Sequence, residues 1–246
     1  MPTLYMFKRS HYNEKARWAL ALKGVDYERQ IMLPGPHSGT IKKLTGQTAV
    51  PVLELDGKYI AGTHAIIEAL EAKYPNPPLI PTDPAEKEQA MGLIAWFDDV
   101  VGVKVRTAFF AAAQNELGFI ARVFSEGQPL AQRHVYRAAL PLVKPIMLKA
   151  NGVTDQAAVD DALAVTGQAL DFIAAETKDR RYLVGDRFTV ADLTAASLLA
   201  ITTRLPHADM KQPEPLPQVM EDWFARWEDH PATDWVQSIF AEHRPV

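Results

Sequence analysis

The stretch VPVLELDGKYI at residues 50–60 decides the fold of the first part of the chain. Two apolar-rich runs flank Asp56-Gly57, and an Asp-Gly pair in that setting favours a two-residue turn between antiparallel strands. Val50 precedes a proline, so its backbone is expected to be extended rather than helical. The stretch therefore predicts a β-hairpin whose first strand begins beside Pro51.

Upstream of the hairpin, the sequence predicts a strand, a helix, a second strand and a short helix. The apolar run Leu4 to Phe7 indicates the first strand. After a polar break at 8–13, apolar residues recur at helical spacing until Gly24, a residue that commonly ends a helix. Residues 27–33 are the expected second strand, and residues 40–44 are the expected short helix.

Downstream of the hairpin, Thr63 is the expected N-cap of a helix that runs to about Tyr74. The element order βαβαββα predicts a thioredoxin-like α/β domain over residues 1–75. A proline-rich run then excludes helix and central strand, which predicts a linker at 76–84. An all-α helical bundle is expected over residues 85–246.

Local signals predict where the helices of this second part begin. Asp83 and Pro84 open a helix expected to reach about Phe124, with glycines that allow it to bend. Thr189 and Asp192 match a capping box. The remaining helices are expected over 130–149 and 154–177, from 188 onward, and from 217 onward, where Met220, Trp223, Phe224 and Trp227 form a stripe typical of a core.

Composition excludes several classes of protein. The chain has 246 residues, a net charge of −4 and no basic cluster, which argues against nucleic-acid binding. It has no cysteine, so it carries no disulfide, thiolate metal site or redox thiol of its own. Its seven histidines do not fall at metal-ligand spacing, and no metal is expected. No apolar run approaches the roughly 18 residues that span a bilayer, and no signal region is visible, so we expect no membrane contact and a cytoplasmic location.

Three segments together carry a resemblance to a known family. The first is residues 10–18, with Ser10, Lys15 and Arg17 at its key positions; the second is residues 50–67; the third is the capping-box segment 188–192. In this order and spacing they resemble cytosolic glutathione S-transferases over essentially the whole chain. The pattern has the look of serine-type, bacterial members and does not assign a class. It implies a thioredoxin-like domain followed by a helical bundle, with glutathione as co-substrate.

The resemblance implies that Ser10 donates a hydrogen bond to the glutathione sulfur. Lowering a thiol pKa by two units from roughly 8.5 needs about 2.7 kcal/mol. One hydrogen bond to a charged group supplies about 1.5–3 kcal/mol, so a serine at a helix N-terminus suffices. The alternative is that Ser10 only caps a helix. A rival residue for activating the thiol is Tyr5, which lies one residue out of register with tyrosine-type members.

The resemblance also implies a glutathione-binding set. In it the bond before Pro51 is cis, the Val50 backbone pairs with the cysteinyl backbone, and Thr63 holds the γ-glutamyl carboxylate. Gly62 and Ala49 stand where many members carry an acidic residue and a Gln or Lys. The expected contacts are Ser10, Tyr12, Ala49, Val50, Pro51, Gly62 and Thr63. The lost carboxylate could come from Asp98 or Asp99 across a dimer, or those residues lie on a solvated helix face.

The leading functional hypothesis is a glutathione transferase that activates the thiol for attack on a small electrophile. The electrophile is expected between the Ser10 loop and the first long helix, near Trp96, Val103 and Arg106. By family analogy the protein is expected to be a homodimer. One alternative is a glutathione-dependent peroxidase or isomerase with the same residues. Another is a non-catalytic protein that binds a ligand or partner on the same fold, which Gly62 and Ala49 favour.

Overall fold

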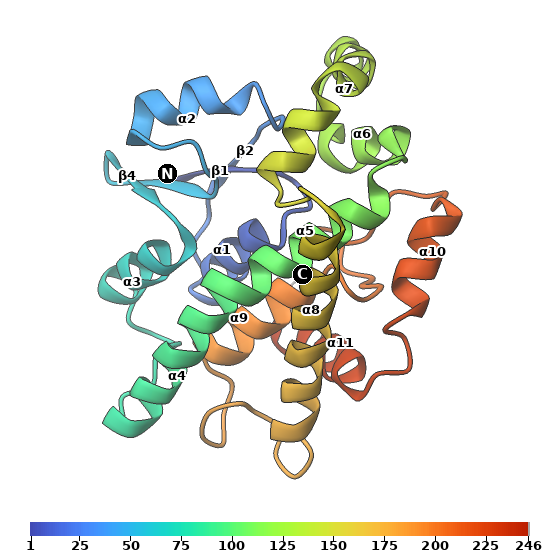
Figure 1. Cartoon of the computed structure of the whole chain (residues 1–246). Coiled ribbons are helices and arrows are strands. Elements are labelled where there is room, and N and C mark those ends of the chain that lie inside the picture. The colour runs from blue at the N-terminus through green and yellow to red at the C-terminus, as the bar shows by residue number, and fades with distance from the viewer. Residues whose placement is uncertain (246) are drawn as a thin grey trace.

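The N-terminal part is a four-stranded mixed sheet with helices on both faces. The computed structural model describes residues 1–245. The sheet order is β2-β1-β3-β4; β1 pairs in parallel with β2 and antiparallel with β3, and β3 and β4 form the hairpin. Figure 1 shows α2 on one side of this sheet and α1 and α3 on the other. The elements are β1 (Thr3–Met6), α1 (His11–Leu22), β2 (Glu28–Ile31), α2 (His37–Thr45), β3 (Val52–Leu55), β4 (Lys58–Ala61) and α3 (Thr63–Lys73).

The order βαβαββα is confirmed, and the hairpin turn has the expected chemistry. Asp56 and Gly57 both have positive φ, 53° and 76°, which is the conformation that a two-residue hairpin turn requires of both its residues. Gly24 also takes a positive φ of 62° immediately after the C-cap of α1. Residues that tolerate a positive φ therefore mark both turns.

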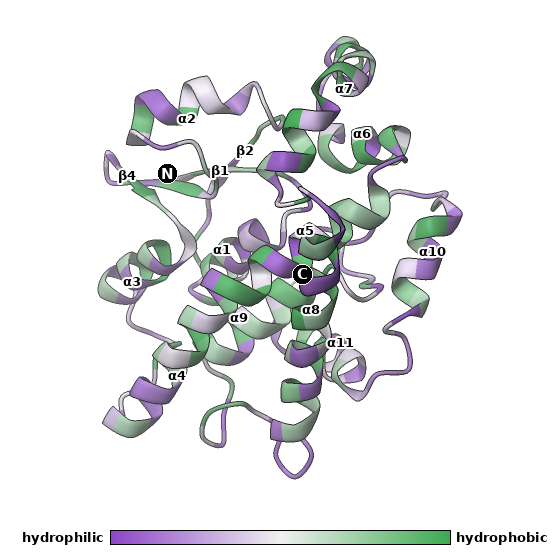
Figure 2. Ribbon diagram, viewed as in Figure 1, coloured by the Kyte–Doolittle hydropathy of each residue, from purple (hydrophilic) through white to green (hydrophobic). Residues whose placement is uncertain are grey.

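The rest of the chain is helical, as expected. Every residue of α9 is buried, so α9 forms the centre of the helical part. In Figure 2 hydrophobic colour predominates on the helices at this centre, whereas the N-terminal end of α4 is hydrophilic. The helices are α4 (Pro84–Trp96), a π-helical turn η1 (Phe97–Val101), α5 (Gly102–Ala113), α6 (Leu117–Ser125), α7 (Leu130–Ala150), α8 (Gln156–Glu176), α9 (Val190–Leu199), α10 (Gln218–Ala225) and α11 (Pro231–His243).

Two signals in this part are confirmed. Thr189 and Asp192 form the capping box at the start of α9. The side chain of Asp192 accepts the N–H of Thr189 at 2.8 Å and the N–H of Leu183 at 2.8 Å. The aromatic stripe that begins in α10 is core, since Met220, Trp223, Phe224 and Trp227 are all buried.

Three expected boundaries are wrong. Thr63 is not the N-cap of α3; Gly62 occupies that position with φ 90°, because its N–H still bonds to the carbonyl of Pro51 as the hairpin ends. The helix from Pro84 does not reach Phe124, since α5 ends at Ala113 and a turn separates it from α6. The short helix expected over 40–44 begins three residues earlier, at His37.

Candidate functional site

A large cavity lies between the α/β part and the helical part. Its volume is about 1110 Å³, slightly above the roughly 300–1,000 Å³ that small-molecule sites occupy. The loop after β1, the segment before α2 and residues 48–50 form one side. Helices α5, α6 and α7 supply most of the other side. A cavity at this boundary is the natural place for a ligand that two parts of a chain hold together.

Ser10 lies at the border of the cavity as the N-cap of α1. Its Oγ accepts the N–H of Asn13 at 3.5 Å, which is at the outer limit of a hydrogen bond. Among residues 1–245 the hydroxyl donates to no acceptor, so its proton is free for a ligand. The partial positive charge of the α1 N-terminus reinforces the preference of this position for an anion. Ser10 is thus a helix cap that retains an unused donor.

The residues on either side of Pro51 adjoin this position. The bond between Val50 and Pro51 is cis, as expected, and Ala49 and Val50 line the same cavity as Ser10. The carbonyl of Pro51 accepts the N–H of Gly62 at 3.1 Å, which places Gly62 and the buried Thr63 directly beside it. Pro51, Gly62 and Thr63 are not among the described residues that line the cavity.

The side chain of Gln47 orders the backbone before Val50, a role that the sequence motifs did not indicate. Its side-chain amide donates to the carbonyl of Ala49 at 2.9 Å and accepts the N–H of Ala49. A carboxamide two residues upstream therefore fixes the backbone that leads into Val50. Because Ala49 has no polar side chain of its own, Gln47 is the side chain that orders this turn.

His11 and Tyr12 fasten the Ser10 loop to the helix across the cavity. Nε2 of His11 lies 2.9 Å from the carbonyl oxygen of Gly102, and the hydroxyl of Tyr12 donates to the carbonyl of Asp98 at 2.5 Å. Burial lowers the pKa of His11 to about 3, so the ring is neutral and its Nε2–H is the donor. Burial also raises the pKa of the Tyr12 hydroxyl, which keeps it protonated. Both acceptors belong to or directly follow the π-helical turn η1, a feature frequent near functional sites.

The three side chains expected beside the electrophile separate in the structure. Arg106 of α5 lines the cavity, but Trp96 and Val103 are not among the described lining residues. Trp96 packs edge-on against Phe97 and Phe172, with ring centroids 4.9 and 5.1 Å away. Helical spacing alone does not tell which face of α5 meets the cavity. Helices α5 and α6 instead contribute aromatic lining residues further along the chain, at Phe109, Phe110 and Phe124.

The remaining candidates lie outside the cavity. Oδ2 of Asp98 is 2.6 Å from Nζ of the buried Lys15, so this carboxylate is already paired within the chain. Asp99 is exposed on the next position of η1. Tyr5 packs against Tyr59 of β4, with ring centroids 6.2 Å apart, and is not among the lining residues of the described chain.

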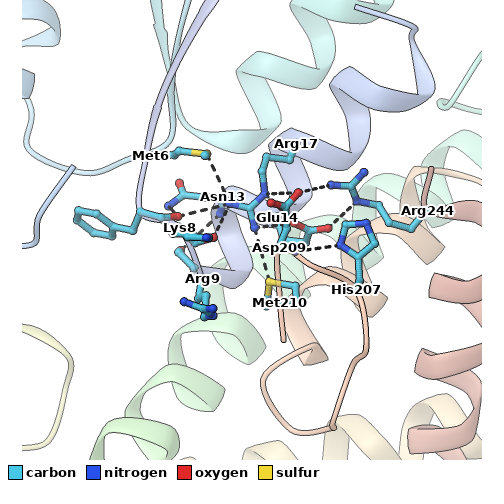
Figure 3. Close-up of polar contacts among 12 residues, drawn as sticks. Met6, Lys8, Arg9, Asn13, Glu14, Arg17, His207, Asp209, Met210 and Arg244 are labelled. Carbon is cyan, nitrogen blue, oxygen red and sulfur yellow. Dashed lines mark hydrogen bonds and ion pairs between the residues drawn. The ribbon is translucent and has the colours of Figure 1, made fainter. Parts of the chain in front are cut away.

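A buried cluster of charged side chains contacts the segment just before Ser10 (Figure 3). Glu14 and Arg17 of α1 pair at 2.6 Å, and Arg244 near the C-terminus lies 2.6 Å from Glu14. Asp209 lies 3.1 Å from Arg244. Arg17 also donates to the carbonyl of Lys8 at 2.7 Å. The cluster connects distant parts of the chain to the segment just before Ser10, a contact that no local sequence signal reveals.

Two further findings concern metal binding and membrane spanning. Within residues 1–245, no group of three His, Cys, Asp or Glu side chains is placed to hold a metal ion. No helix among these residues combines the length and apolar character needed to cross a membrane.

Comparison with known proteins identifies both halves of the chain. A model described as the glutathione S-transferase N-terminal domain matches residues 4–78, and one described as the glutathione S-transferase C-terminal domain matches residues 133–231. The structure is similar to a glutathione S-transferase from Rhodospirillum rubrum F11, with 25% identity, a TM-score of 0.61 and coverage of 100% of this chain and 96% of that one. A theta-class enzyme from Xanthomonas axonopodis pv. citri with glutathione bound has a TM-score of 0.58 at 22% identity, with 96% of each chain covered.

Curated relatives match over shorter stretches. A maleylacetoacetate isomerase of Pseudomonas aeruginosa is 35% identical over 120 residues, which is 46% of this chain and 55% of that protein. A probable maleylacetoacetate isomerase of Caenorhabditis elegans is 37% identical over 94 residues, which is 37% of this chain and 44% of that protein. The chain therefore spans about half the length of the curated relatives it matches.

Proposed function

This chain belongs to the glutathione S-transferase family, and we propose that it transfers glutathione to a small electrophile with Ser10 activating the thiol. One observation carries the proposal: Ser10, with an unused hydroxyl donor at the N-terminus of α1, borders the same cavity as Ala49 and Val50. In that arrangement the backbone at Val50 would hold the cysteinyl part of glutathione and direct its sulfur toward Ser10. We further propose Tyr12 as a wall of this subsite and Thr63 as the contact for the γ-glutamyl carboxylate.

The chemistry asks little of the protein. The thiol loses its proton to solvent, the hydroxyl of Ser10 and the dipole of α1 stabilise the thiolate, and the sulfur then forms a bond to the electrophilic carbon. A thiol with a pKa of roughly 8.5 is mostly protonated at neutral pH. Lowering its pKa by about one to two units raises the fraction of thiolate and so speeds the reaction.

Ultraviolet absorbance of the bound thiolate, titrated against pH, tests this proposal. Ser10→Ala is expected to raise the pKa of bound glutathione by about one unit or more, because a charged hydrogen bond worth about 1.5–3 kcal/mol is lost. Conjugation at neutral pH should fall roughly tenfold with it. Tyr5→Phe is the matched control and should leave the thiolate pKa alone. An unchanged pKa in Ser10→Ala, or a raised pKa in Tyr5→Phe, would contradict the assignment.

A second candidate is glutathione-dependent isomerisation with the same residues, which the names of the Pseudomonas aeruginosa and Caenorhabditis elegans relatives favour. Transfer consumes the free thiol, whereas isomerisation returns it. Titration of free thiol during turnover therefore separates the two. The non-catalytic alternative rests on Gly62 and Ala49, and it predicts no detectable glutathione binding by calorimetry.

Assembly and location complete the proposal. We propose a homodimer, in which Asp99 on the exposed side of η1 is available to a partner subunit. Light scattering at micromolar concentration should give twice the mass of the chain.

We also propose that the chain divides into a domain at 1–75, a linker at 76–84 and a domain at 85–246. Limited proteolysis, with cleavage expected in the linker, tests this division. We propose a cytoplasmic location by analogy with the cytosolic members of the family.

A further inference from the structure

Arg106 is a cation without a counter-charge inside the cavity. Its Nε is buried and has no hydrogen-bond partner, and among residues 1–245 no ion pair or hydrogen bond reaches its guanidinium. Burial lowers the pKa of Arg106, yet a guanidinium stays protonated at any ordinary pH. Arg106 as a whole is half-buried, so its charge is partly desolvated, and a bound anion would gain a charge-assisted interaction there.

The other charged groups around the cavity do not neutralise Arg106. No Asp or Glu is found among the described residues that line it. The second lining arginine, Arg9, is paired with Glu126 and also donates to the carbonyl of Lys211 at 2.5 Å. Nη1 of Arg9 is also buried without a hydrogen-bond partner, but the charge of Arg9 is balanced by Glu126, whereas that of Arg106 is not balanced by any carboxylate among the described residues.

Arg106 lies on α5 close to the point where the loop that follows Ser10 contacts that helix. Gly102, whose carbonyl contacts His11, is one helical turn before Arg106 on α5, so about 6 Å of helix separates them. His11 directly follows Ser10 in the sequence. A carboxylate on Arg106 would consequently be close to the sulfur that Ser10 is proposed to bind.

The part of the cavity that adjoins Arg106 along α5 is apolar, and the cavity opens along α7. Phe109, Phe110 and Phe124 supply aromatic walls from α5 and α6. Val135 and Ile146 of α7 line the cavity and are also 70% and 71% exposed, so the opening runs along α7. A ligand with an apolar body would leave that body against these walls and toward α7.

We propose that the electrophile of this enzyme is a carboxylic acid with an aromatic or similarly bulky apolar body, and that Arg106 binds its carboxylate. Arginine suits this role because its planar fork matches the two oxygens of a carboxylate. The inference rests on the proposed function and adds to it a substrate class and a specificity-determining residue.

An aroylacrylic acid illustrates the step. The glutathione thiolate forms a carbon–sulfur bond at the alkene carbon β to the ketone, and the π electron pair moves to form the enolate of that ketone. The enolate carbon then takes a proton from water. Glutathione has added across the double bond with no leaving group and no oxidant, while the carboxylate stays paired with Arg106 throughout.

Binding is tested without any turnover. Benzoylpropanoate, which lacks the alkene, and its methyl ester are titrated into the glutathione-saturated protein and into the free protein by calorimetry. The acid should bind at least about tenfold more tightly than the ester, as expected for one charge-assisted contact. Arg106→Gln should reduce this acid-to-ester ratio by about tenfold, and Arg106→Lys should retain part of it. Arg137→Gln is the matched control, because Arg137 is exposed on α7 outside the cavity.

The outcomes separate this inference from the proposed function. Equal affinities for acid and ester, or an acid-to-ester ratio that survives in Arg106→Gln of native melting temperature, would overturn the inference. A loss of glutathione affinity in Arg106→Gln with the ratio unchanged would also overturn it, since Arg106 would then serve a carboxylate of glutathione. The turnover rates of benzoylacrylate and its methyl ester give the corresponding acid-to-ester ratio for catalysis, which should also fall in Arg106→Gln. If neither compound is turned over but the acid still binds through Arg106, the transferase proposal fails and the anion site stands.

Discussion

Nε2 of His11 lies 2.9 Å from the carbonyl oxygen of Gly102, so the residue after Ser10 is held to the helix on the other side of the cavity. The next residue repeats the connection, because the hydroxyl of Tyr12 donates to the carbonyl of Asp98. Both acceptors are main-chain carbonyls at the π-helical turn. The position of Ser10 relative to the helical part therefore depends on the backbone of η1 and on how closely α1 approaches it.

That close approach predicts that Gly102→Ala is destabilising. A Cβ at this position would lie 2.7 Å from the hydroxyl oxygen of Tyr12 and 2.9 Å from its Cζ. Tyr12 must shift and loses its hydrogen bond, so we expect a loss of about 1–3 kcal/mol in unfolding free energy, measured by urea denaturation. Gly92→Ala is the control; its Cβ meets nothing within 4 Å in α4, and it should add about 0.5–1 kcal/mol. Equal stability of the two variants would show that the contact is not tight.

His11 predicts a specific pH dependence of stability. Its pKa falls from 6.5 to about 3 in the folded protein because burial penalises the charged ring. Between these values the unfolded chain binds a proton that the folded chain does not, so stability falls as the pH drops below 6.5. The contribution of His11 should be about 2 kcal/mol smaller at about pH 5 than at about pH 8.

His11→Gln isolates this contribution, because glutamine does not titrate. Urea denaturation of both proteins over this range should give a difference in unfolding free energy that narrows as the pH falls. A parallel pH dependence in the two proteins would mean that His11 accepts a proton without cost in the folded state.

The parts of the fold that follow from short-range chemistry could be predicted from the sequence. The hairpin at Asp56-Gly57 depends on two residues that tolerate positive φ, and the capping box depends on Thr189 and Asp192 three positions apart. The error at Thr63 has the same local origin, since a hydroxyl residue is a good N-cap but Gly62 takes the required backbone conformation beside Pro51.

The parts that depend on distant contacts could not be predicted. The end of α5 at Ala113 is not marked by a glycine or proline, so the sequence does not indicate that the long helix expected from Pro84 ends there. Which side of α5 faces the cavity is fixed by its packing against other helices, and this is why Arg106 lines the cavity and Val103 does not. Glu14 and Arg244 pair although they lie 230 positions apart, and the sequence around either residue carries no signal that predicts the other as its partner.

The capping box predicts a loss of stability that is independent of chemistry. Thr189→Ala removes the hydroxyl that accepts the N–H of Ala191 and should cost about 0.5–2 kcal/mol. Asp192→Ala should cost more, about 2–4 kcal/mol, because two buried backbone N–H groups and the hydroxyl of Thr189 lose their acceptor. Differential scanning calorimetry gives both values. Turnover per folded molecule should stay at the parent level; a changed turnover at unchanged stability would show that this motif reaches the site.

Ser10→Cys asks whether the N-terminus of α1 favours a thiolate at all. The parent chain has no cysteine, so the variant carries a single thiol whose pKa is read directly from the pH dependence of alkylation by iodoacetamide. A thiol at a helix N-terminus typically has a pKa below the ordinary value of roughly 8.5, and a value of about 7 or lower is expected here. Ser238→Cys, within α11 and away from a helix N-terminus, is the control and should stay near roughly 8.5.

The same variant should gain a reaction that serine does not support. With a mixed disulfide of glutathione as substrate, the thiolate introduced by Ser10→Cys would attack the glutathione sulfur and expel the other sulfur as a thiolate, and mass spectrometry would detect the resulting protein–glutathione disulfide. An ordinary thiol pKa in Ser10→Cys would show that the helix dipole does not stabilise a thiolate at this position. The hydroxyl of Ser10 alone would then have to stabilise the thiolate of bound glutathione. A lowered pKa without disulfide formation would instead place the thiol where glutathione cannot reach it, and the shared cavity of Ser10 and Val50 would no longer support the proposed transfer.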